Sequence, residues 1–128
     1  MSRVTHFEIP AKDPNKVAAF YKEVFGWQSN KWEGPVDYWL VMTGPNEVPG
    51  INGGFYTPDG GPMSGVINTI EVDDLDAHIS KIKANGGIVV VDKMAVPGVG
   101  WMIYFKDVEG SLWGLMQLDG SAGIPPQE

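Results

Sequence analysis

An internal repeat is the feature that most constrains the fold of this chain. The segment that begins at Val66 matches the start of the chain at a spacing of 61 residues without a gap, which places Ile70 on Ile9 and Asp74 on Asp13. In each copy an alternating run precedes the aspartate, and apolar residues at helical spacing follow it. Three further strand-like runs come after each helix. Each half is therefore predicted to form a strand, a helix and then three strands.

Both predicted helices begin after an aspartate. Asp13 is followed by Pro14, and proline at the first helical position loses no hydrogen bond. The first helix is predicted to end at Gly26, and the second at the pair Gly86-Gly87. One apolar stripe is expected to be buried on each helix. The stripes are Val17, Phe20, Tyr21 and Val24 in the first helix, and Leu75, Ile79 and Ile82 in the second.

The two halves give modules at residues 3–57 and 65–119, joined by a proline- and glycine-rich linker at 58–64. Neither module alone can bury both faces of a four-stranded sheet and a helix, so we expect one domain over residues 1–128. In the first module, the predicted strands run from Arg3 to Ile9 and over 28–33, 38–43 and 51–56. In the second module, the first strand precedes Asp74, and the other three cover 88–93, 101–106 and 111–118.

Composition excludes several classes of protein. Sixteen acidic residues against nine basic ones give a net charge of −7, and the lysines are scattered, which argues against nucleic acid as a partner. The chain has no cysteine, so neither disulfides nor thiolates carry fold or function. No stretch is long and apolar enough for a membrane span, and the start lacks the apolar core of a signal peptide. We therefore expect a cytoplasmic protein that does not contact a membrane.

Three segments in this order resemble the vicinal oxygen chelate superfamily, which contains glyoxalase I, bleomycin-resistance proteins and extradiol dioxygenases. The segments are HFEIPAKDPNKVAAFYKEVFGW, IEVDDLDAHISKIKANGG and VPGVGWMIYFKDVEGSLWGLMQ. The resemblance covers the chain from about Val4 to Leu118. It implies an α+β fold in which two tandem βαβββ modules form a cup-shaped half-barrel, and it implies a homodimer.

The same resemblance raises the question of a metal. Superfamily enzymes hold a divalent metal with inward-facing side chains from the first and fourth strands of each module. His6 matches one of these four positions, whereas the others fall on Ile67, Gly53 and Gly114, which have no donor atom in the side chain. A catalytic metal needs about three protein ligands and an open position. We therefore expect no metal cofactor.

An alternative metal site stays open. Glu8 shares the strand face of His6, and Glu71 lies on the matching face of the second module's first strand. These three residues form an atypical ligand set for Zn, Ni, Mn or Fe. A register slip of one residue presents Asn68 or Gln117 in place of Ile67 or Gly114, and these amides are weak ligands.

The expected cavity is apolar with a few polar points, as is typical of small-molecule sites. No residue is assigned as catalytic, although His6 and Glu8 are candidates. Aromatic residues on curved sheets also pack in cores or dimer interfaces, and that reading stays open. The predicted ligand-binding residues are His6, Glu8, Trp39, Glu71, Trp101, Tyr104 and Met116.

Three functions are compatible with these features. The first is a small-molecule-binding protein whose cup lacks most of the usual metal ligands, as in the bleomycin-resistance branch. The second is a glyoxalase-like lyase or isomerase, or a dioxygenase, that uses the atypical metal ligands. The third is an interaction domain without a small ligand. Nothing in the sequence names a substrate, because one scaffold hosts many chemistries in this superfamily.

Overall fold

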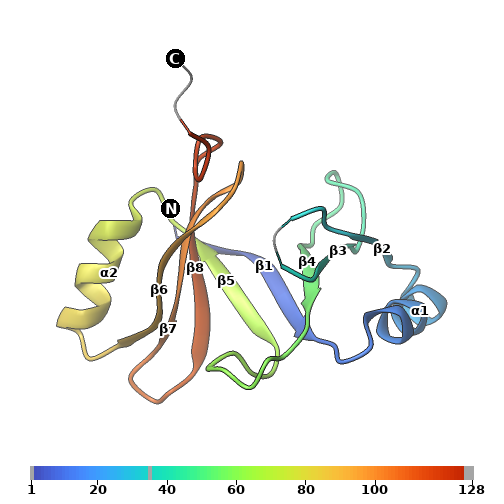
Figure 1. Cartoon of the computed structure of the whole chain (residues 1–128), viewed down its shortest axis with the longest axis horizontal. Coiled ribbons are helices and arrows are strands. Elements are labelled where there is room, and N and C mark those ends of the chain that lie inside the picture. Colours follow the sequence, from blue (N-terminus) through green and yellow to red (C-terminus); the bar gives the residue numbers. More distant parts are fainter. Residues whose placement is uncertain (1, 35, 126–128) are drawn as a thin grey trace. The chain divides into compact units, whose positions relative to one another are not determined.

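A computed structural model describes residues 2–34 and 36–125, and within them the chain forms eight strands and two helices (Figure 1). The order confirms the predicted α+β arrangement of two tandem βαβββ modules. Neither helix in these ranges is long and apolar enough to cross a membrane. The elements are β1 (Arg3–Pro10), α1 (Pro14–Phe25), β2 (Gln28–Lys31), β3 (Tyr38–Met42), β4 (Asn52–Tyr56), β5 (Ile67–Glu71), α2 (Leu75–Ala84), β6 (Ile88–Val96), β7 (Gly100–Lys106) and β8 (Leu112–Leu118).

The chain divides into two compact units. The N-terminal unit is Thr5–Ile67, and the C-terminal unit comprises residue 68 onward together with the start of the chain as far as Val4. Each unit has its own cluster of buried apolar side chains.

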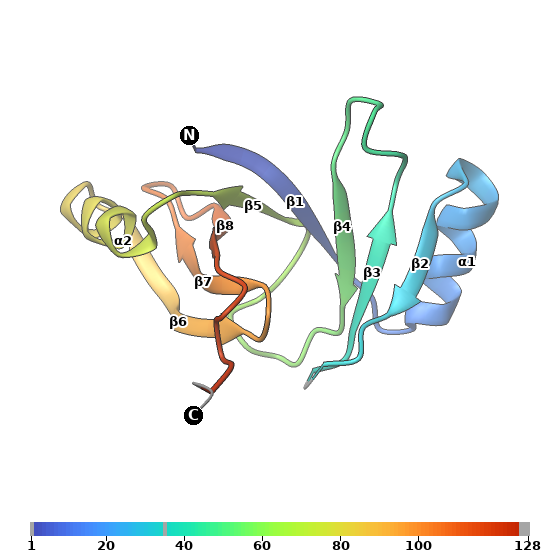
Figure 2. The same ribbon diagram turned by 90° about the horizontal axis from the view of Figure 1, so that it is seen from above.

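In the N-terminal unit, the strands lie in the order β2-β3-β4-β1. β1 and β4 are parallel, and the other neighbours are antiparallel. Helix α1 covers one face of this sheet and lies beside β2 (Figure 2). As predicted, α1 begins at Asp13, whose carboxylate accepts a hydrogen bond from the Lys16 amide at 3.2 Å, and it ends at Gly26 in the left-handed conformation.

The buried stripe of α1 differs from the predicted one. Val17, Ala18 and Tyr21 pack against the core of the unit, whereas Phe20 is 57% exposed and Val24 is 54% exposed. The helix is therefore rotated so that the small Ala18 faces the sheet. Because Phe20 and Val24 share a spacing of four residues, both turn to the outer side together.

In the C-terminal unit, the strands lie in the order β5-β8-β7-β6, with β5 parallel to β8. Helix α2 begins at Asp74, which accepts a hydrogen bond from the Ala77 amide at 3.0 Å. Its predicted apolar stripe packs against the sheet, and Leu75 is completely buried. The core on this side consists of Val72, Leu75, Ile103, Phe105 and Leu115.

Each sheet thus has one face covered by its own helix and a second face that this helix does not touch. We call the second one the helix-free face. Because side chains alternate along a strand, the core residues of each unit identify by parity the residues on its helix-free face.

Candidate functional site

The helix-free face of the N-terminal unit contains the two polar residues predicted on the first strand. His6 and Glu8 alternate with Phe7 and Ile9, which pack against the core below α1. The strand pairing places Gly54 opposite Glu8. The residues of this face are His6, Glu8, Tyr38, Leu40, Asn52, Gly54 and Tyr56.

A chain of hydrogen bonds joins three of these side chains. The His6 Nε2 atom lies 2.7 Å from the Tyr38 hydroxyl oxygen, and the Tyr38 hydroxyl donates to the Glu8 carboxylate. A tyrosine hydroxyl has a single hydrogen, so with Glu8 as its acceptor the Tyr38 oxygen accepts from His6. This assigns the Nε2–H tautomer to His6 and leaves Nδ1 as the acceptor nitrogen of the ring.

Burial and the charge on Glu8 set the protonation of this chain. Burial lowers the pKa of His6, which keeps the imidazole neutral at neutral pH. Burial, the Glu8 charge and the hydrogen bond to Glu8 together raise the pKa of Tyr38 far above its usual value. The pKa of Tyr56 is raised as well, by burial and by Glu8. The Tyr38 hydroxyl therefore keeps its hydrogen at neutral pH and donates it to Glu8.

Tyr38 also occupies the space beside β4. A Cβ atom added to Gly54 would collide with the Tyr38 ring and with its hydroxyl oxygen. In the repeat, Gly54 is the counterpart of Gly114, because Glu8 pairs with Gly54 as Thr69 pairs with Gly114. The assignment of this position to Gly53 was wrong by one residue, since Gly53 lies on the helix side against Phe7.

The helix-free face of the C-terminal unit has two cross-strand rows. Thr69, Gly114, Tyr104 and Val91 are neighbours in one row across β5, β8, β7 and β6. The second row consists of Glu71, Met116, Met102 and Met94. A Cβ atom added to Gly114 would lie 2.6 Å from the Thr69 hydroxyl oxygen and 3.3 Å from the Tyr104 ring.

The predicted ligand-binding residues therefore separate into three groups. His6 and Glu8 lie on the helix-free face of the N-terminal unit, and Glu71, Tyr104 and Met116 lie on that of the C-terminal unit. Trp39 and Trp101 do not lie on these faces. Trp39 packs against the core below α1.

Trp101 packs against the core of the C-terminal unit. Its indole nitrogen donates to the Asp119 carboxylate at 3.1 Å, and the Lys93 ammonium group lies 5.2 Å from the centre of its ring. These contacts give Trp101 a packing role in this structure.

Within residues 2–34 and 36–125, no group of three or more histidine, aspartate or glutamate side chains is arranged to hold a metal ion. His6 already has its Nε2 atom directed at Tyr38. The other histidine, His78, lies on α2, where its Nδ1 atom is 2.7 Å from the carbonyl oxygen of Asp74.

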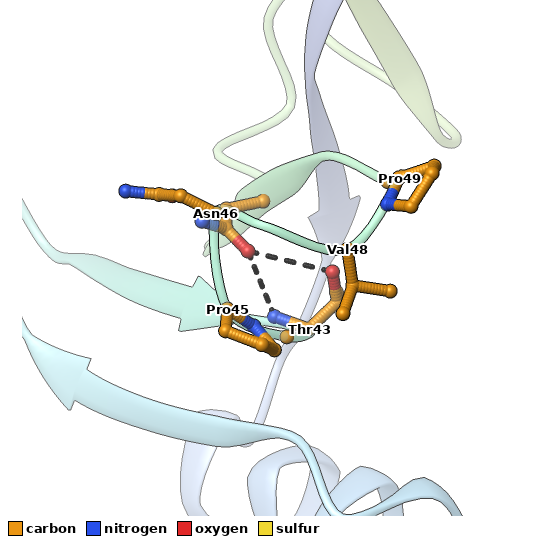
Figure 3. Close-up of a pocket in the computed structure, with 8 residues that line it drawn as sticks. Thr43, Pro45, Asn46, Val48 and Pro49 are labelled. Carbon is orange, nitrogen blue, oxygen red and sulfur yellow. Dashed lines mark hydrogen bonds between the residues drawn. The ribbon is translucent and has the colours of Figure 1, made fainter.

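Two surface hollows lie away from the predicted site residues. One has a volume of about 120 Å³ and lies at the turn between β3 and β4, where the Thr43 amide donates to the Asn52 side chain at 2.9 Å (Figure 3). The other, of about 340 Å³, lies between α1 and β2 and is lined by residues that include Lys22 and Trp27. Neither contains any of the predicted ligand-binding residues.

The predicted ligand-binding residues include neither Tyr38 nor Thr69. Both belong to the site only through the pairing of strands, which brings Tyr38 of β3 to His6 of β1 and Thr69 of β5 to Gly114 of β8. The alternation within each strand was the available signal, but it does not identify the neighbour across the sheet.

Comparison with known proteins places the chain in a family. The family model described as the glyoxalase/bleomycin resistance protein/dioxygenase superfamily matches residues 3–115. The chain belongs to this superfamily. A superfamily relative, a glyoxylase-like domain-containing protein of Didymella fabae, is 31% identical over 116 residues, which are 85% of this chain and 88% of the relative. The CFP32 protein of Mycobacterium tuberculosis (strain CDC 1551 / Oshkosh) is 30% identical, and the match covers 86% of this chain but only 42% of CFP32.

Solved structures agree with this superfamily fold. The hypothetical protein BH1468 from Bacillus halodurans C-125 has a TM-score of 0.71 at 16% identity, covering 99% of this chain and 98% of that one. Methylmalonyl-CoA epimerase from Mycobacterium tuberculosis has a TM-score of 0.68 at 17% identity, covering 91% of this chain and 87% of the epimerase. At these identities the likeness is one of fold.

Proposed function

We propose that this superfamily member binds a small organic molecule on a helix-free face and does so without a metal ion. The observation that carries the proposal is the pair of glycines at the positions where the superfamily pattern calls for metal-binding side chains. Gly54 and Gly114 provide no donor atom, and neighbouring side chains occupy the space that a longer residue needs. Tyr38 fills it at Gly54, and Thr69 fills it at Gly114.

The state of His6 supports the same proposal. A metal-bound imidazole offers a ring nitrogen without hydrogen to the metal, and usually donates its other N–H to a polar group. The His6 Nε2 atom is engaged with Tyr38, and the Tyr38 hydroxyl is engaged with Glu8. A metal on Nε2 has to displace Tyr38 and break both hydrogen bonds. One imidazole and one carboxylate also fall short of the three ligands of a catalytic metal.

Each helix-free face by itself has residues that suit a binding site for an uncharged or weakly polar molecule. On the face of the N-terminal unit, Leu40 provides an apolar side chain and His6 a polar point. On the face of the C-terminal unit, Met102 and Met116 provide the apolar side chains and Glu71 the polar point. A small number of directed polar groups on an apolar surface fixes the orientation of a bound molecule.

Metal analysis of the protein purified without chelator tests the proposal, and we expect a metal content well below one ion per chain. The variant His6→Ala and its matched control His78→Ala, which removes the other histidine, are expected to give the same result. A stoichiometric content of Zn, Ni, Mn or Fe that His6→Ala abolishes and His78→Ala retains contradicts the proposal, and it favours the metal-dependent enzyme.

Binding is followed in parallel by intrinsic tryptophan fluorescence during titration with a panel of small aromatic and aliphatic compounds. We expect saturable changes with some of them. If no compound of a broad panel binds, the interaction domain without a small ligand becomes the preferred function.

A further inference from the structure

The two units carry a polar residue at the same position of the repeat, but the hydrogen bonding of this residue differs between them. Glu8 on β1 corresponds to Thr69 on β5 at the spacing of 61 residues. Both are buried, with exposed fractions of 5% and 3%. Glu8 accepts a hydrogen bond from Tyr38, which its own unit provides. Among the described residues, nothing forms a hydrogen bond with the Thr69 hydroxyl.

A buried hydroxyl without a partner is costly. Native proteins pair the large majority of buried polar side-chain atoms, and an unpaired one usually has a functional reason or a partner that is not part of the chain. At this position a valine has almost the same shape as threonine, is favoured in strands and carries no desolvation cost. The hydroxyl of Thr69 is therefore a feature that packing alone does not explain.

The surroundings of Thr69 limit what such a partner can be. Next to the Thr69 row lies the row of Glu71, Met116, Met102 and Met94, so three of the chain's six methionines are cross-strand neighbours. Methionine side chains are unbranched and polarisable, adapt their shape at low cost and form favourable contacts with aromatic rings. Their row provides a deformable apolar surface beside a hydroxyl and a carboxylate.

We propose that this face binds an aromatic compound that carries a hydroxyl or amino group. The ring lies against Met102 and Met116, and the polar group donates to the Glu71 carboxylate or to the Thr69 oxygen. Thr69 is thus a specificity-determining residue. The inference rests on the proposed function, because it names the class of ligand and one anchor of the same kind of site.

Phenol is the first probe, with anisole and toluene as matched compounds. Anisole lacks the hydrogen that phenol donates, and toluene lacks any polar group. Binding is followed by NMR of protein labelled with carbon-13 at the methionine methyl groups, which resolves the location of the site. We expect phenol to shift Met102 and Met116, and to leave the signals of Met42 on β3 and Met63 in the linker unchanged. Phenol is expected to bind more tightly than anisole or toluene.

The variant Thr69→Val removes the hydroxyl and keeps the shape of the side chain. We expect it to weaken phenol binding about tenfold, the effect of one lost hydrogen bond, and to leave toluene binding unchanged. Thr69→Ser, which keeps a hydroxyl, is expected to retain the preference for phenol over toluene. Without ligand, Thr69→Val is expected to raise Tm by about 2–5 °C, because the cost of the unpaired hydroxyl is removed.

Several outcomes overturn the inference. Equal phenol affinities of Thr69→Val and the unaltered protein exclude Thr69 as an anchor, and a lower Tm for Thr69→Val contradicts the unpaired state of the hydroxyl. Shifts confined to Met42 place the ligand on the N-terminal unit, so that the proposed function survives while this inference fails. If neither phenol nor any compound of the fluorescence panel binds, both fail.

Discussion

At the scale of single residues, the hydrogen bonds from His6 through Tyr38 to Glu8 couple three titratable groups that belong to two strands. A carboxylate that is 5% exposed needs such partners, because a buried charge without hydrogen bonds is strongly disfavoured. The same bonds hold the Tyr38 ring beside Gly54, where a side chain at position 54 would collide with it. These hydrogen bonds therefore orient three side chains of this face, and the position of Tyr38 favours glycine at position 54.

The lowered pKa of His6 predicts a specific dependence of stability on pH. The unfolded chain binds a proton at the histidine's ordinary pKa of about 6.5, while the folded protein resists protonation because His6 is buried. The free energy of unfolding is therefore expected to fall as the pH is lowered below about 6.5, until the lower folded pKa is reached. His6→Gln is expected to reduce this dependence, because glutamine keeps an N–H donor and does not titrate.

Urea denaturation of both proteins at a series of pH values between about 5 and 8 measures the effect. His78→Gln, prepared in parallel, separates the loss of His6 from the loss of any histidine. An unchanged slope of stability against pH in His6→Gln contradicts the buried, neutral state of this ring.

Sequence reasoning was accurate for residues on one strand and inaccurate across strands. Strand alternation correctly put His6 and Glu8 on one face, since that face depends only on local parity. It did not identify Gly54 as the repeat counterpart of Gly114, and it did not show that Trp39 lies below α1. Both facts depend on the register of pairing, which strand sequences alone leave undetermined.

At the scale of secondary-structure elements, local chemistry determined the helices closely. Asp13 and Asp74 cap α1 and α2 as predicted, because a carboxylate next to unpaired amides satisfies them directly. Strand ends were less accurate: β6 continues to Val96, beyond the predicted end at Lys93. After two register shifts, β6 continues to pair with β7 as far as Gly100. The end of β6 is therefore determined by its pairing with β7 and not by its own sequence.

The two caps give a matched prediction. Asp13→Ala and Asp74→Ala are each expected to lower the free energy of unfolding by about 1 kcal/mol, because each removes the acceptor of an amide at a helix start. Asp92→Ala serves as the control, since Asp92 is an exposed aspartate of β6 and its loss is expected to change stability by less than about 0.5 kcal/mol.

Urea denaturation followed by far-ultraviolet circular dichroism measures all three variants. Equal stabilities of the two cap variants and the control contradict a stabilising role for the caps. If only one cap variant is destabilised, the two caps contribute unequally to the free energy of unfolding, although both helices begin with an aspartate cap.

At the scale of the whole molecule, the repeat accounts for much of the organisation. Each copy forms a compact unit with its own core, and the family match covers both copies. The copies then diverge at equivalent positions, where one carries His6 and Glu8 and the other carries Ile67 and Thr69. This divergence gives the two helix-free faces different chemistry. The homodimer stays a prediction.

The net charge of −7 predicts which ligands the molecule disfavours. A chain with this charge, and with Glu71 on the proposed face, repels anions through its overall field. We therefore expect 4-hydroxybenzoate, an anion with the same phenol group, to bind more weakly than phenol at low ionic strength. The difference is expected to shrink as salt is raised from about 0.01 M to about 1 M, since the Debye length falls from about 30 Å to about 3 Å.

The ratio of the two dissociation constants, measured by the same methionine NMR titration at both salt concentrations, tests this expectation. Phenol is uncharged and serves as the internal control, because its affinity is expected to change little with salt. If the ratio stays constant as salt is raised, the preference for phenol over the anion comes from short-range contacts such as that with Glu71. Buried or close charges are screened far less by salt than distant ones. If 4-hydroxybenzoate binds more tightly than phenol at low salt, repulsion of anions by the negative charge of the chain is contradicted.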